Sequence, residues 1–225
     1  RVVVSFRGGL FTLIPPSLHP AMRRISPRPP THRSGLTLIE LMVTLALLAL
    51  LATLAVPSFQ RQIAAANVSN AANEMLLAAS RARTEAIRLG SRVTVCKSSD
   101  GAQCDTTTAG WETGWITFID PVRTSSTSAT VDSGETITFK VSPLSGVKIL
   151  GNGDLANYFS YAADGRSKLM NGGFLAGRIR VCSPSGALND DNRARDLCIS
   201  NSGRAVLVTP TGVGPACPAP SSSGC

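Results

Sequence analysis

A single carboxylate stands inside a long apolar stretch near the start of the chain. Glu40 follows Gly35 by five positions, and residues 41–59 after it carry no charge. A charged side chain at the centre of a bilayer costs roughly 2.5 to 3.5 kcal/mol on insertion scales, so acids retained there usually have a function. The position of Glu40 therefore makes it the first candidate for a functional residue.

Six cysteines form the second group of reactive side chains, and all of them follow the apolar stretch. An even number of cysteines beyond a membrane anchor indicates an oxidising compartment and disulfides. Six cysteines allow fifteen pairings, and the spacings lack the CxxC pattern of a zinc site. Proximity in the sequence favours the pairs Cys96–Cys104, Cys182–Cys198 and Cys217–Cys225.

The remaining polar residues do not suggest catalysis. Both histidines, His19 and His32, precede Gly35, so the rest of the chain lacks the base of a Ser-His-Asp or Cys-His group. The polar runs at 151–154 and 190–192 are typical of turns, and the second lacks the spacing of a calcium loop. We expect no enzymatic activity, no metal and no cofactor.

The net charge of +8 is concentrated at the N-terminus. Residues 1–35 hold six arginines and no acid, so outside this segment 16 basic residues face 14 acidic ones. The basicity therefore belongs mostly to a targeting segment, and a strongly basic surface on the remaining chain is not expected.

The elements that must position these residues begin with one long helix. The apolar segment reaches the length of about 20 residues that spans a membrane, and a helical periodicity continues beyond it to Gly90. We predict a helix over 36–89, with a transmembrane part at 36–60 and a periplasmic part at 61–90. Pro57 should kink this helix because proline removes a backbone hydrogen bond.

Beyond Gly90 the pattern changes to short β-type runs separated by turn residues, which predicts a β-rich domain over 91–209. Residues 210–225 are rich in Pro, Gly and Ser and are expected to form a flexible tail that contains two cysteines. The predicted strands are 92–97, 114–119, 135–141, 147–150, 157–161, 175–182, 196–200 and 203–209.

The run from Gly35 to Leu41 (GLTLIEL) resembles the processing motif of type IV pilins and type II secretion pseudopilins. The resemblance implies a leader over 1–35, with Met22 as a plausible true start, and cleavage between Gly35 and Leu36 by a prepilin peptidase. It also implies N-methylation of Leu36, although the family usually has Phe there. Glu40 then pairs with the new amine of a neighbouring subunit, where mispairing would leave a charge unpaired in an apolar region.

A second segment, residues 111–120 (WETGWITFID), resembles the W-x-x-G-W-x-x-F-x-D pattern of the GspH/FimT group of minor pilins. Residues 80–86, 92–96, 194–200 and 202–204 are similar to the same group. The resemblance implies an α+β fold of the type IV pilin kind, in which a long N-terminal helix packs on a C-terminal antiparallel β-sheet domain. The two tryptophans are interpreted as core residues of this fold.

Two functions are compatible with this family. The first is a minor pseudopilin of a periplasmic type II secretion filament, anchored in the inner membrane with its N-terminus cytoplasmic and its domain periplasmic. Its partners are other pilins, the prepilin peptidase and the membrane.

The alternative is a minor type IV pilin that binds DNA for uptake or primes pilus assembly. Some relatives carry a Gly-Arg-x-Arg motif for this, whereas here the corresponding Gly203-Arg204-Ala205-Val206 lacks the second arginine. The possible DNA contacts are Arg178, Arg180, Arg193, Arg195 and Arg204.

Overall fold

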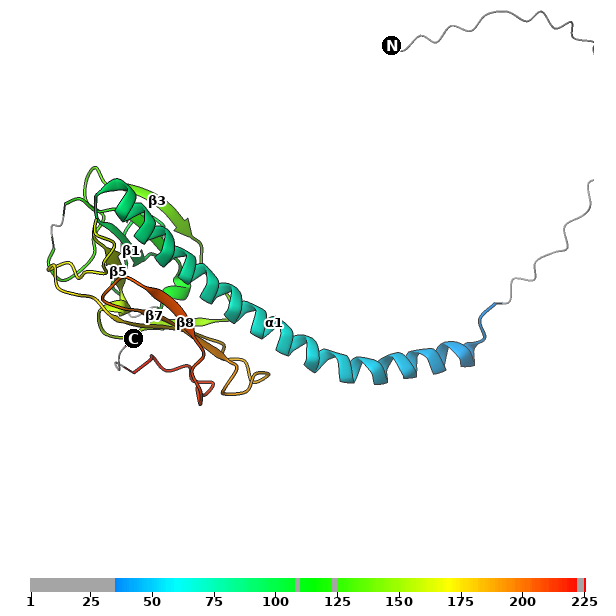
Figure 1. The fold of residues 1–225 in the computed structure, drawn as a ribbon. Coiled ribbons are helices and arrows are strands. Elements are labelled where there is room, and N and C mark those ends of the chain that lie inside the picture. Colours follow the sequence, from blue (N-terminus) through cyan, green and yellow to red (C-terminus); the bar gives the residue numbers. More distant parts are fainter. Residues whose placement is uncertain (1–34, 108–109, 123–124, 222–224) are drawn as a thin grey trace, which may run out of the picture. The chain divides into compact units, whose positions relative to one another are not determined.

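The computed structural model describes residues 35–107, 110–122, 125–221 and 225 (Figure 1). The leader predicted over 1–35, including Met22, therefore lies outside the described residues except for Gly35. Within these ranges, one long helix is followed by eight strands and two short 3₁₀ helices, Trp111–Thr113 and Gly153–Ala156. This order confirms the predicted α+β class.

Helix α1 spans Leu38–Leu89, close to the predicted bounds. Its start is capped by Thr37, whose hydroxyl oxygen accepts a hydrogen bond from the backbone N–H of Glu40 at 3.2 Å. Its end is set by Gly90, which adopts a φ of 62° that side-chain-bearing residues rarely take. The next amide, of Ser91, donates back to the carbonyl of Ala86 at 3.3 Å and closes the last turn.

The two parts of α1 have different surroundings. The described side chains from 38 to 63 are exposed, and this part is long and apolar enough to cross a membrane. Pro57 lies inside the helix without ending it, and the kink at this residue stays a prediction. From Ala64 onward one face of the helix is buried and consists mainly of small residues, which allow close packing: Ala64, Val68, Ala71, Ala72, Met75, Ala78, Ala79, Ala82 and Ala86.

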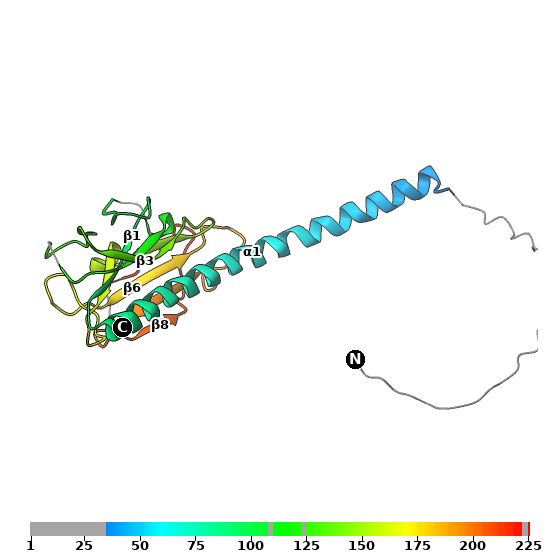
Figure 2. The ribbon, with the colours of Figure 1, turned by 90° about the horizontal axis from the view of Figure 1, so that it is seen from above.

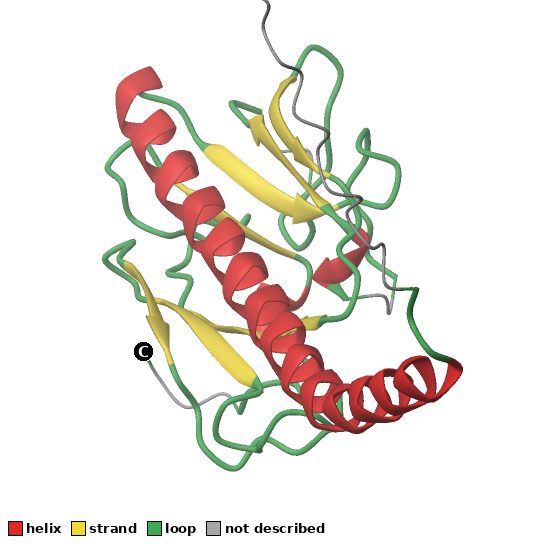
Figure 3. Ribbon diagram, turned by 90° about the vertical axis from the view of Figure 1, so that its right-hand side faces the viewer, coloured by secondary structure: helices red, strands yellow, loops and turns green. Residues whose placement is uncertain are grey.

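Eight antiparallel strands form two four-stranded sheets beneath the C-terminal part of α1 (Figures 2 and 3). Their bounds differ from the predicted ones by at most two residues. The first sheet has the order β3 (Thr136–Val141), β2 (Trp115–Ile119), β1 (Val93–Lys97) and β5 (Tyr158–Tyr161). The second has the order β4 (Lys148–Gly151), β6 (Gly177–Cys182), β7 (Ala194–Ile199) and β8 (Ala205–Val208).

Both tryptophans lie in the core between α1 and the sheets. Trp111 and Trp115 are fully buried, and the ring of Trp111 stacks on Phe159 with a centroid separation of 5.6 Å. The indole N–H of Trp111 donates to the carbonyl of Leu155 at 3.0 Å, so its one polar atom is satisfied. The W-x-x-G-W segment is therefore a packing element of the fold, as the sequence indicated.

The disulfides agree with sequence proximity in one case of three. Cys96 pairs with Cys104, as expected, but Cys182 pairs with Cys217 and Cys198 with Cys225. The expected pairs Cys182–Cys198 and Cys217–Cys225 are wrong. The register of β6 and β7 excludes the first pair, and the second does not form because Cys217 and Cys225 each bond to one of these two strand cysteines. Cys182 lies opposite Ala194, four residues from Cys198, which corresponds to about 13 Å along a strand. A disulfide needs Cα atoms within about 7 Å.

The two long-range disulfides hold the C-terminal segment against the outer face of the second sheet, which corrects the expected flexible tail. Val213 and Cys217 are buried there, and the backbone N–H of Val213 donates to the carbonyl of Asp190 at 3.0 Å. The guanidinium of Arg180 donates to the carbonyl of Pro218 at 3.3 Å. The described part of this segment is thus a strap across the sheet.

Candidate functional site

The residues predicted for processing and assembly lie just before α1 and in its first turn. Leu36 is 74% exposed, and Gly35 and Glu40 are also exposed. Glu40 forms no ion pair with another described residue, so its carboxylate is available to a cation from outside the chain. The exposed apolar side chains that follow would surround such a pair with a low-dielectric environment, which strengthens it.

Two of the five candidate DNA-binding arginines are occupied by internal partners. Arg180 forms a bidentate ion pair with Asp196, at 2.8 Å from Nε and 2.9 Å from Nη2, and the side chain of Asp196 is fully buried. Arg193 is 4% exposed and pairs with Asp190 at 3.1 Å. Its guanidinium also donates to the carbonyls of Ser183, Ser185 and Leu188. Both arginines therefore stabilise the fold and do not present their charge to a phosphate.

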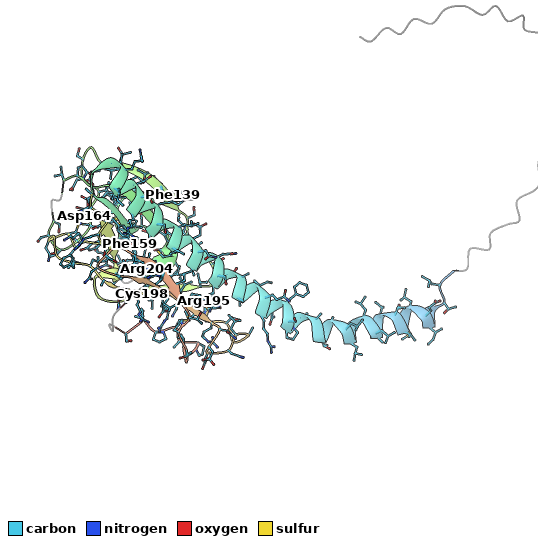
Figure 4. All side chains as sticks on the ribbon, viewed as in Figure 1. Phe139, Phe159, Asp164, Arg195, Cys198 and Arg204 are labelled. Atoms are coloured by element: carbon cyan, nitrogen blue, oxygen red, sulfur yellow. A yellow bond between two sulfur atoms is a disulfide. The ribbon has the colours of Figure 1, made fainter. Side chains whose placement is uncertain are left out.

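The other three arginines do not form one cluster. Arg178 lies opposite Cys198 on the outer face of the second sheet, the face that also carries Arg180. Arg195 lies opposite Val181 on the face toward α1. Arg204 is exposed in the turn between β7 and β8, at the end of the strand pair remote from Arg195 (Figure 4). The possibility that all five arginines gather into one DNA-binding surface is therefore wrong.

A different group of cations lies on a loop beside the turn that carries Arg204, and sequence reasoning did not find it. Lys168 and Arg166 lie over the exposed ring of Phe174, at 4.2 Å and 6.0 Å from its centroid. The loop that carries them packs closely against the β7–β8 turn. There is no room for a side chain at Gly203, because an added Cβ atom would collide with the carbonyl oxygen of Gly165. Only tertiary structure brings these residues together, because they are about 30 to 40 positions apart in the chain.

Comparisons with known proteins give two family matches on the two parts of the chain. Residues 71–203 match the family described as Type II transport protein GspH, and residues 30–56 match the prokaryotic N-terminal methylation motif. Crystal structures of the type IV minor pilin FimU of Pseudomonas aeruginosa strain PAO1, in two space groups, are 18% identical in sequence with TM-scores of 0.44. They cover 64% of this chain and 93% and 98% of their own. No curated protein matches the chain.

Proposed function

The chain belongs to the GspH family of type II transport proteins and is a pilin-like structural subunit, and we propose that it acts as a minor pseudopilin of a type II secretion filament. One observation carries this proposal. The methylation motif and the GspH-type domain are joined by a single 52-residue helix, which supplies both an anchor and a surface for assembly.

Processing of the N-terminus is the first step of the proposed function. A prepilin peptidase cuts between Gly35 and Leu36, and Leu36 receives the methyl group. The arginines before Gly35 keep the N-terminus on the cytoplasmic side, so the sheet domain enters the periplasm. The disulfides support this location, because such bonds persist in oxidising compartments.

Assembly with other pilins then depends on Glu40. Cleavage creates a positive amine on Leu36, and the carboxylate of Glu40 pairs with the amine of a neighbouring subunit. An ion pair in an apolar region fixes the register of two helices because any other register leaves a buried charge unpaired.

Deletion of the chain from its host distinguishes a secretion filament from a pilus. We expect folded exoproteins to accumulate in the periplasm, while the number of surface pili stays unchanged. Immunoblots of the medium and periplasm and electron microscopy of the cell surface measure the two effects. Normal secretion with a loss of pili would assign the chain to a type IV pilus instead.

DNA binding remains the second candidate, and the cations on the loop beside the β7–β8 turn favour it. Arg166 and Lys168 lie over the exposed ring of Phe174, and their loop contacts the turn that carries Arg204. Cations bind phosphates and an exposed aromatic ring can stack on a base, so this arrangement suits a nucleic acid.

A gel shift of duplex DNA with the full chain in detergent tests this candidate. If DNA binds at low salt, Arg204→Gln should lower the slope of log affinity against log salt by about 1, and Arg166→Gln should do the same. Lys148→Gln, an exposed cation on β4, serves as the matched control and should leave the slope unchanged. The absence of any shift at low salt removes DNA binding from consideration.

A further inference from the structure

A narrow cleft beside α1 contains Arg195. The cleft has a volume of about 190 Å³ and lies between the helix and the end of the β7–β8 pair. Arg195 is partly buried, and Figure 4 shows it beside the helix. The cleft is lined by Ser69, Ala72, Asn73, Arg195, Leu207 and Thr209.

Arg195 differs from its neighbours in having no carboxylate partner among the described residues. Its Nη1 donates to the carbonyl of Ala194 at 2.7 Å, which leaves most of its five N–H donors for another group. Arg180 and Arg193, by contrast, are each paired with an aspartate. A partly buried charge without an opposite charge is costly, so this arrangement suits a group that arrives from outside.

The walls of the cleft define the chemistry of that group. The guanidinium offers parallel donors that match a carboxylate, and the exposed side chains of Ser69, Asn73 and Thr209 add hydroxyl and amide donors. None of the described residues that line the cleft is acidic. Its volume suits one side chain and is too small for a peptide segment or a nucleotide.

The position of the cleft indicates where the carboxylate comes from. It opens between an exposed flank of α1 and β8, which is an outer strand of its sheet, and both are elements that a filament neighbour can reach. The other flank of α1 shows that this kind of helix can present a suitable carboxylate. There Glu74 is exposed, lines a different groove next to β3, and pairs with no described cation. A contact between unlike flanks is heterologous, which is the kind that builds an open helical assembly.

We propose that the Arg195 cleft receives a carboxylate side chain of a neighbouring pilin-like subunit in the filament. This inference rests on the proposed function and adds a second intersubunit ion pair, in the periplasmic domain, to the one at Glu40. The cation is supplied by this chain and the carboxylate by the neighbour's helix flank.

The test compares Arg195→Gln with Lys148→Gln, which removes an exposed positive charge on β4, at the opposite edge of the second sheet. Each full-length chain replaces the natural one in the host, and the fraction recovered with purified filaments is measured. We expect Arg195→Gln to lower this fraction at least about tenfold, Arg195→Lys to restore part of it, and Lys148→Gln to leave it unchanged. The midpoint of thermal unfolding of each purified chain should stay within about 2 °C of the unaltered protein.

Four other results of this experiment would each lead to a different conclusion. Unchanged recovery of Arg195→Gln overturns the inference while leaving the proposed function intact. A clear fall in its unfolding midpoint assigns Arg195 to fold stability and also overturns it. If added acetate protects the cleft from arginine-specific modification while recovery is unchanged, the cleft binds small anions only. If the unaltered chain is absent from filaments, the proposed function itself fails.

Discussion

Replacing Glu40 by alanine should remove the chain from filaments while cleavage after Gly35 continues. The substitution leaves the amine of a neighbouring Leu36 without its partner in an apolar region. Breaking one half of a buried ion pair costs about 3–5 kcal/mol, which corresponds to a loss of at least about 100-fold in incorporation. The fraction of chain that sediments with filaments, and the size of the membrane-bound chain on a gel, measure the two effects.

The structure makes a matched control necessary, because Glu40 also lies at a capped helix start. The Thr37–Glu40 spacing is that of a capping box, in which the acid supports the first turn through hydrogen bonds. Glu40→Gln keeps that hydrogen-bonding capacity and removes the charge, whereas Thr37→Ala removes the cap and keeps the charge. The ion-pair account expects Glu40→Gln to fail like Glu40→Ala and Thr37→Ala to assemble. The reverse pattern would assign Glu40 to helix capping.

Replacing Asp196 by alanine should have the largest effect on stability among the ion pairs described here. Asp196 is fully buried and holds Arg180, whose side chain is only 13% exposed, through two hydrogen bonds. Its removal leaves a guanidinium beneath the C-terminal strap without an opposite charge. We expect the free energy of unfolding to fall by about 3–5 kcal/mol. Urea unfolding of the full chain in detergent, followed by tryptophan fluorescence, measures this change because both tryptophans are buried.

Asp190→Ala is the matched control for this prediction. Asp190 also pairs with an arginine, but its side chain is 56% exposed, and Arg193 keeps three backbone carbonyl partners after the change. Because the Asp190 carboxylate is largely solvated and the buried Arg193 guanidinium keeps its carbonyl acceptors, this variant should lose clearly less free energy of unfolding than Asp196→Ala. Equal losses of unfolding free energy in the two variants would contradict the role of Asp196 as the buried partner of Arg180.

The elements of the fold could be predicted because their signals are local. The apolar run, the helical spacing up to Gly90 and the alternating strands depend on neighbours within a few positions, and all eight strands were found within two residues. The tryptophans were interpreted as core residues because a large aromatic side chain in such a domain has few other places to pack.

The disulfides and the arginines could not be predicted in the same way, because their partners depend on strand register. Cys182 and Cys198 are close in sequence but lie at opposite ends of the β6–β7 pair. Register likewise places Arg180 opposite Asp196 and turns Arg195 toward the helix. The group around Phe174 arises from a loop that reaches the β7–β8 turn, for which the sequence has no local signal.

We expect this chain to be processed at Gly35 and to reside in a filament through its N-terminal helix. The intact mass of the chain recovered from purified filaments tests both expectations most directly. The expected species begins at Leu36, carries one added methyl group and contains three disulfides. A filament-bound chain that retains residues before Leu36, or a processed chain that is found only in the membrane, would contradict these expectations.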